Sequence, residues 1–207
     1  MNLNKLETGD IIMFNSETQH GFFKYFSEIL RYGTHSNYTH IGMVLKDPTF
    51  LKSKINKNFK GLYFWESSLE NIKDIQDNDI KLGVQIVPLK DVIEKNNDIM
   101  IARKVNCDKK LFNDKKLQEI NDVVHNKPYD IIPKDWLNAF LRRDNNPQKT
   151  DRFWCSALVG YIYTKVGILH ESTDWSILRP SDFSLISENL SFNNGCSLSN
   201  DEFLINK

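Results

Sequence analysis

Residues 153–159 read Phe153-Trp154-Cys155-Ser156-Ala157-Leu158-Val159, and this stretch decides the fold. After Cys155, apolar side chains recur at the i+3, i+4, i+7 and i+11 positions, which is the spacing of one face of a helix. Gly167 follows this run, and glycine is the residue that most often ends a helix. The stretch therefore predicts a helix over about 155–166 that begins at a cysteine.

A cysteine at the start of a helix suggests a nucleophile. The first turn offers a partial positive charge and backbone N–H groups without helical partners. Both favour the thiolate, and the N–H groups can also hold the oxyanion of a tetrahedral intermediate. In the competing interpretation Cys155 belongs to the core, because the apolar residues at helical spacing lie on its face of the helix.

His40 is the candidate base. It opens the run His40-Ile41-Gly42-Met43-Val44-Leu45, which predicts a strand with His40, Gly42 and Val44 on one face. Gly42 would leave a gap on that face for another backbone or a substrate. A thiol nucleophile needs a proton carrier nearby, and imidazole is the usual one. The alternative is a histidine at a strand end that bonds to a loop.

Glu66 lies near the end of a second predicted strand, Gly61–Ser67, on the same face as Leu62 and Phe64. A carboxylate among apolar side chains is costly to bury unless it has a partner. If this strand pairs with the strand of His40, Glu66 could orient the imidazole and stabilise its charged form. The alternative is a carboxylate that points at water.

The remaining patterns predict an α+β domain. Strands are expected over 11–14, 84–89 and 99–105, and helices over 20–32, 111–124 and 136–141, the second with its apolar stripe at Leu117, Ile120, Val123 and Val124. Several strands follow one another without helices between them, which favours an antiparallel sheet packed against the cysteine-bearing helix. We expect a single domain over 1–207, with its core at about 6–185. The Lys- and Asn-rich segment 51–60 should be a solvated loop, residues 128–130 a turn, and the polar tail after about 187 loose.

The amino-acid composition of the chain argues against some classes of binding partner. Lys plus Arg and Asp plus Glu both number 27, so the formal net charge is 0 and nothing draws the chain toward nucleic acid. The N-terminus lacks an apolar signal segment, and no apolar run approaches the ~20 residues that a membrane span needs. We therefore expect a cytoplasmic protein. The bias toward lysine is typical of AT-rich genomes, including those of large DNA viruses, for which the host cytoplasm or the virion would be the location.

Taken together, the motifs resemble the circularly permuted papain-like hydrolases of the NlpC type, in particular the YiiX/YebB-like group. In ordinary NlpC-type enzymes the cysteine helix comes first, then a Gly-Asp-apolar strand, then a His-x-Gly strand. Here Gly9-Asp10-Ile11-Ile12 comes first, Thr39-His40-Ile41-Gly42 second and the cysteine stretch last, which is the permuted order. The resemblance covers about residues 6–185 and extends to four further motifs: Trp65-Glu66-Ser67, Gly83-Val84 with Pro88-Leu89, Lys127-Pro128-Tyr129-Asp130, and Arg179-Pro180-Ser181-Asp182.

The resemblance implies a papain-like fold with Cys155 as nucleophile, His40 as base and Glu66 as the polar third residue, acting through a thioester and without a cofactor. Tyr38 and Tyr129 are candidates to donate a hydrogen bond to the oxyanion, with ordinary packing as the alternative. Ser156 would contribute its backbone or a helix cap. Peptides, peptidoglycan-like amides and fatty-acyl esters or amides are the substrate classes.

Two other functions remain open. The permuted group resembles lecithin:retinol acyltransferase in architecture, so transfer of a lipid acyl group is one. The other is a catalytically silent host-interaction module that kept the scaffold. The aromatic run Phe22–Phe26 reads as a core helix, or as a contact with an acyl chain or a membrane surface if one side is exposed. Oligomeric state has no signal in the sequence.

No metal site is expected. Cys107 and Cys196 lack the Cys-x-x-Cys or histidine spacing of zinc ligands. The histidines other than His40 read as surface or loop residues: His20, His35, His125 and His170. With three cysteines, the sequence predicts no disulfide framework.

Overall fold

The computed structural model describes residues 3–15, 38–68, 71–131 and 149–205 of the 207-residue chain. The helices expected over 20–32 and 136–141, the run Phe22–Phe26, and the histidines His20 and His35 lie outside the described residues.

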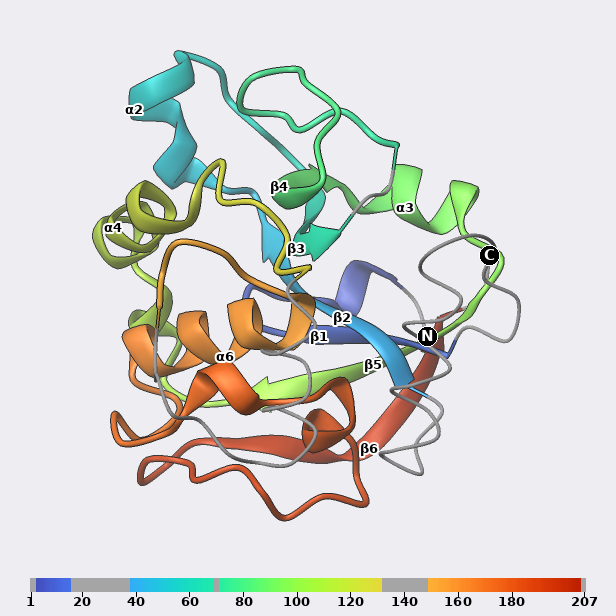
Figure 1. The fold of residues 1–207 in the computed structure, drawn as a ribbon, viewed down its shortest axis with the longest axis vertical. Helices are drawn as coiled ribbons and strands as arrows, with labels where there is room; N and C mark the ends of the chain where they lie inside the picture. Colours follow the sequence, from blue (N-terminus) through green and yellow to red (C-terminus); the bar gives the residue numbers. More distant parts are fainter. Residues whose placement is uncertain (1–2, 16–37, 69–70, 132–148, 206–207) are drawn as a thin grey trace.

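A six-stranded antiparallel sheet forms the centre of the molecule, in the order β4-β3-β2-β1-β5-β6 (Figure 1). Neighbouring strands are mostly consecutive in the chain, as expected for hairpin-like connections. The mixed α/β class and the antiparallel sheet confirm the prediction from sequence. The strands are β1 (Ile11–Asn15), β2 (Tyr38–Lys46), β3 (Leu62–Ser68), β4 (Gly83–Pro88), β5 (Ile99–Asn106) and β6 (Ser197–Ile205).

Four α-helices are described: α2 (Lys52–Ile55), α3 (Leu89–Lys95), α4 (Asp114–Val124) and α6 (Cys155–Val166). Five short 3₁₀ helices accompany them, and these are η1 (Leu3–Lys5), η2 (Thr49–Leu51), η3 (Lys109–Phe112), η4 (Trp175–Ile177) and η5 (Pro180–Phe183). The predicted cysteine helix is confirmed: α6 begins at Cys155 and ends at Gly167, whose φ of 93° is left-handed. No helix in the described part of the chain is both long enough and apolar enough to span a bilayer.

Both faces of the sheet are buried. On one face, side chains such as Met13, Ile41 and Met43 pack with α4 and α6; we call this cluster the α6-side core. On the other face, residues such as Val44 and Phe64 pack with α3; we call this the α3-side core. The alternation of β2 between the two cores confirms the predicted faces of the strand that contains His40.

The Gly9-Asp10 motif is structural. Gly9 has a φ of 97°, and a side chain there would collide with the Phe112 ring. Asp10 is fully buried, and its carboxylate accepts from the backbone N–H of Glu7 (2.9 Å) and of Val105 (3.1 Å). These bonds fasten the start of β1 to the end of β5.

Three predictions are wrong. The tail after about 187 is not loose, because β6 pairs with β5 and buries Leu198 and Ile205; polar residues between them hid an edge strand that needs only one buried face. The segment 51–60 contains α2 and buries Leu51 and Phe59, so only part of it is solvated. The strand expected to reach Leu89 ends at Pro88, where α3 begins.

Two further details differ from expectation. The turn predicted at 128–130 lies instead at 125–126, because Pro128 and Tyr129 form isolated bridges with Gly83 and Phe153. In α4, Val123 is 37% exposed, whereas Leu117, Ile120 and Val124 are buried as predicted. Asn121, rather than Val123 as predicted, lies on the buried face of α4.

Candidate active site

Cys155 is the first residue of α6 and is only 2% exposed. The backbone in front of it is held in place from two sides. The Ser67 hydroxyl donates to the Phe153 carbonyl (2.7 Å), and Phe153 also bridges to Tyr129 through backbone bonds. Because Ser67 lies near the end of β3, these bonds place Cys155 at that end of the sheet.

The residues on either side of Cys155 are anchored to one carbonyl group. The Trp154 indole N–H (3.2 Å) and the Ser156 hydroxyl (2.7 Å) both donate to the Leu178 carbonyl oxygen. The N-cap of α6 is Trp154, which makes no side-chain capping bond, so the prediction of a cap by Ser156 is wrong. The Ser156 side chain instead fixes the first turn of α6 against the segment that follows η4.

His40 lies near the start of β2, at the same end of the sheet. Its ring packs against the rings of Phe14 and Phe64, with centroids 5.2 and 6.4 Å away. The gap expected beside Gly42 is filled, because a Cβ at Gly42 would lie 2.4 Å from the Phe64 ring. The His40 imidazole therefore packs against aromatic rings, and these rings restrict its orientation.

Glu66 provides the polar contact of that imidazole. His40 Nε2 lies 2.6 Å from Glu66 Oε2, and Glu66 is fully buried. The alternative that Glu66 points at water is therefore wrong. Burial of a carboxylate is tolerated when hydrogen bonds satisfy it.

Gln85 completes this arrangement and was missed by the sequence analysis. It is fully buried on β4, directly opposite Glu66, and its side-chain amide donates to Glu66 Oε1 and Ser68 Oγ, both at 3.1 Å. Its one signal in the sequence is a polar residue inside the apolar run Val84-Gln85-Ile86-Val87. Glu66 is thereby held between an imidazole and an amide.

The electrostatics of His40 join it to Cys155 as well as to Glu66. Burial lowers the pKa of His40, but side-chain hydrogen bonds with Cys155 and Glu66, and the charges of those two groups, raise it well above 6.5. Cys155 belongs to the α6-side core, and the His40 ring contacts the α3-side core. The interaction between His40 and Cys155 therefore connects the two cores at the end of the sheet. A histidine with a raised pKa can hold a proton beside a thiolate.

The two tyrosines differ in position. Tyr129 is buried, and its pKa is raised well above 10 by burial, by the charge of Cys155 and by a hydrogen bond with Cys155. Its hydroxyl therefore stays protonated beside the sulfur. The hydroxyl of Tyr38 instead donates to Glu202 Oε2 on β6 (2.8 Å), so its single proton is engaged in that bond.

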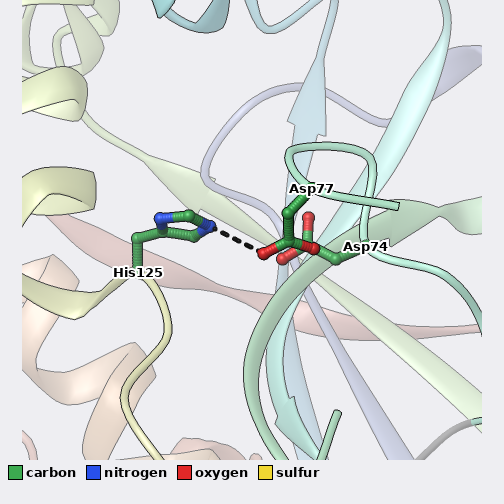
Figure 2. A group of neighbouring side chains, drawn as sticks. All are labelled: Asp74, Asp77 and His125. Carbon is green, nitrogen blue, oxygen red and sulfur yellow. Dashed lines mark ion pairs between the residues drawn. The ribbon is translucent and has the colours of Figure 1, made fainter. Parts of the chain in front are cut away.

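A second polar cluster was not predicted from sequence. Among the described residues, Asp74, Asp77 and His125 form the one group whose potential metal-ligand atoms lie within 4.8 Å of one another (Figure 2). His125 Nε2 lies 3.4 Å from Asp77 Oδ2, so His125 is an ion-pair partner rather than a free surface residue.

Lys81 supplies the cation of this cluster. Its ammonium nitrogen lies 2.8 Å from Asp74 Oδ2 and 2.5 Å from Asp77 Oδ2, and it also donates to Asn126. A divalent ion would have to displace this ammonium group from two carboxylates. The cluster fits an internal ion pair that fastens the loop before β4 to the end of α4, and it does not fit a metal site.

No model of a known protein family matches the chain, and no curated protein matches it. A solved structure described as that of the metalloprotein yiiX from Escherichia coli O157:H7, DUF1105, aligns with a TM-score of 0.48 and 23% sequence identity. The alignment covers 77% of this chain and 66% of the other, so this chain spans slightly less than two thirds of that protein's length.

Proposed function

We propose that this protein is a cysteine hydrolase that cleaves an amide or ester through a thioester on Cys155, with a permuted papain-like arrangement of its catalytic residues. The observation that carries the proposal is the position of His40, which bonds to Cys155 at the start of α6 and to the buried carboxylate of Glu66. A nucleophile, a base and an orienting group in this order form the general plan of nucleophilic acyl transfer.

In the proposed mechanism His40 carries the proton. Nε2 lies 2.6 Å from Glu66 Oε2, so in this mechanism Nδ1 is the ring nitrogen left to take the proton of the thiol. The thiolate sulfur attacks the acyl carbon, and the proton then passes from the imidazolium to the leaving amine or alcohol. Water, deprotonated by His40, hydrolyses the thioester and restores the thiol.

Tyr129 and the first turn of α6 would support the negative charge in the transition state. The Tyr129 hydroxyl remains a donor because its pKa is raised, and it already bonds to Cys155. Backbone N–H groups at the helix start provide the other donors. Ser156, whose hydroxyl bonds to Leu178, contributes by keeping that turn in place.

The yiiX protein is described as a metalloprotein, but no metal has a role in this proposal. The polar groups of Cys155, His40 and Glu66 interact with one another. In the other cluster, which contains Asp74, Asp77 and His125, the carboxylates bind the Lys81 ammonium group.

The test uses a Cys107→Ser, Cys196→Ser background, in which Cys155 is the one thiol of the chain. Iodoacetamide, a small electrophile, should alkylate Cys155 at pH 7 faster than it alkylates free cysteine. Substitution His40→Gln in the same background should slow this reaction by about 10²-fold or more, the scale of general-base assistance. An activated ester such as p-nitrophenyl acetate should leave an acetyl group on Cys155 that mass spectrometry detects.

A catalytically silent module gives the opposite result. Cys155 would then react no faster in the parent background than after His40→Gln, and no acyl adduct would form. That outcome would reject the hydrolase proposal. A long-lived acyl adduct that is released by an added alcohol or amine, but not by water, would favour an acyltransferase instead.

A further inference from the structure

Cys107 and Cys196 come from distant parts of the sequence, yet the β5–β6 ladder brings them to one place. The last two register pairs are Val105 with Leu198 and Asn106 with Ser197. Asn106 Nδ2 also donates to Ser197 Oγ (3.4 Å) across the final pair. Continuing the register by one residue sets Cys107 opposite Cys196.

The two thiols also share a face. Val105 and Leu198 are both buried in the α6-side core. Side chains alternate along a strand, so the residues two positions away on each strand point the same way. Cys107 and Cys196 do pack against that core, and both are partly exposed free cysteines.

An electrostatic observation agrees with this placement. Burial raises the pKa of Cys107, Lys109 lowers it, and the charge of Cys196 raises it further. Burial also raises the pKa of Cys196. The two sulfur groups are therefore near enough to influence each other, and both are thiols at neutral pH.

Directly opposite residues in an antiparallel pair have Cβ atoms about 4.5–5.5 Å apart. A disulfide needs about 3.5–4.5 Å. The chain can close a gap of about 1 Å here, because Cys107 lies just beyond the end of β5 and Cys196 follows a turn at Gly195, whose φ is 81°.

We propose that Cys107 and Cys196 form a reversible disulfide that staples the edge strand β6 to β5. The oxidant is a low-molecular-weight disulfide. One protein thiolate attacks it, which forms a mixed disulfide and releases one small thiol. The second protein thiolate attacks the protein-side sulfur, which closes the bond and releases the second small thiol. The two thiol protons end on the released thiols, and the oxidant gains two electrons.

The bond would constrain a strand with contacts elsewhere in the fold. The Ser199 carbonyl on β6 accepts from Arg103, and Glu202 accepts from Tyr38, two residues before His40. The disulfide would close a loop over residues 107–196, which includes α4 and α6. Cross-links over loops of this length stabilise folded chains, and we expect Tm to rise by about 5–10 °C.

The experiment uses the full-length Cys155→Ala chain, in which Cys107 and Cys196 are the two remaining thiols. The folded protein is treated with oxidised glutathione at pH 8.5, where more of each thiol is ionised, then alkylated and mapped by peptide mass spectrometry. The expected product has lost two hydrogen atoms, contains a linked Cys107–Cys196 peptide and carries no glutathione. Dithiothreitol should reverse both the link and the rise in Tm.

Cys196→Ser in the same background is the matched control. Cys107 then has no partner and should keep a stable glutathione adduct, without a rise in Tm. Stable adducts on both cysteines of the two-thiol chain, links between chains, or no link in the folded protein would each overturn the proposal. The result does not depend on any activity of Cys155. Failure of the disulfide proposal can therefore be distinguished from failure of the proposed function.

Discussion

His40 Nε2 lies 2.6 Å from Glu66 Oε2 in a setting where the carboxylate is fully buried and the imidazole is 12% exposed. A hydrogen bond between these groups in a dry environment orients the ring and favours its protonated form. The same imidazole bonds to Cys155, so in the proposed mechanism Glu66 acts on the sulfur through His40.

Substitution Glu66→Gln keeps the size of the side chain and removes its charge. We expect the rate of Cys155 alkylation, measured with Cys107 and Cys196 replaced by serine, to fall by about 10²–10⁴-fold, because the amide no longer stabilises the imidazolium. Glu202→Gln, which changes a carboxylate on β6, is the matched control and should leave the rate within about twofold. Equal rates for Glu66→Gln and the parent would contradict the role of Glu66.

The stability of the protein should depend on the protonation of His40. Its folded-state pKa is raised above the ordinary 6.5, so the folded chain binds this proton more tightly than the unfolded chain. The stabilisation is fully present below about pH 6.5 and is lost as the pH rises through the folded-state pKa. Urea unfolding of the parent and of His40→Gln should therefore give curves whose difference is largest at low pH. A difference that grows with pH would contradict this assignment.

Gln85 is expected to be a positioning residue. Gln85→Leu removes the donor to Glu66 and Ser68, and the unpaired buried oxygens should cost about 1–3 kcal/mol of unfolding free energy. If Gln85 also positions Glu66, the His40 pKa, followed by NMR, should change in this variant. Ser68→Ala, which removes only the other acceptor of Gln85, should leave that pKa in place. A loss of stability with an unaltered His40 pKa would make Gln85 purely structural.

Tyr129→Phe isolates the contribution of one hydroxyl group. The ring remains, so the α6-side core should stay packed, with a loss of about 1 kcal/mol for the hydrogen bond. The rate at which p-nitrophenyl acetate acylates Cys155 should fall by about tenfold or more, because an oxyanion donor is removed. Tyr38→Phe is the control, since its hydroxyl donates to Glu202, and should acylate at the parent rate. Equal acylation rates for the parent and Tyr129→Phe would show that the hydroxyl only packs.

The local elements were largely predictable from sequence. Five of the six strands contain apolar or aromatic runs, and α6 has both helical spacing and a glycine stop. The pattern of β6 is weak because a register shift opposite Arg103 and Val105 places extra residues between Leu198 and Glu202, which breaks the alternation of β6 itself. In addition, Leu198 and Ile205 are the buried residues of a largely exposed strand. Pairing with β5, which is a long-range contact, decides its structure.

The sequence identified the site residues that have a distinctive reactive or polar side chain. It did not identify the residues whose role depends on their position in the fold. Cys155, His40 and Glu66 each stand out as reactive or polar groups beside apolar runs. Gln85 becomes meaningful only through the β3–β4 register, which sets it opposite Glu66. The difference between Tyr38 and Tyr129 likewise depends on which hydroxyl faces Glu202 and which faces Cys155, and no spacing in the sequence encodes that.

The titration of His40 in the parent and in Cys155→Ala, followed by ¹⁵N–¹H NMR of the imidazole, tests most directly whether the thiol and the imidazole form a pair. Removal of the sulfur should lower the pKa of His40, because the hydrogen bond and the charge from Cys155 are lost while those from Glu66 remain. The same His40 pKa in both proteins would contradict the pair, and the proposed hydrolase mechanism would fail with it.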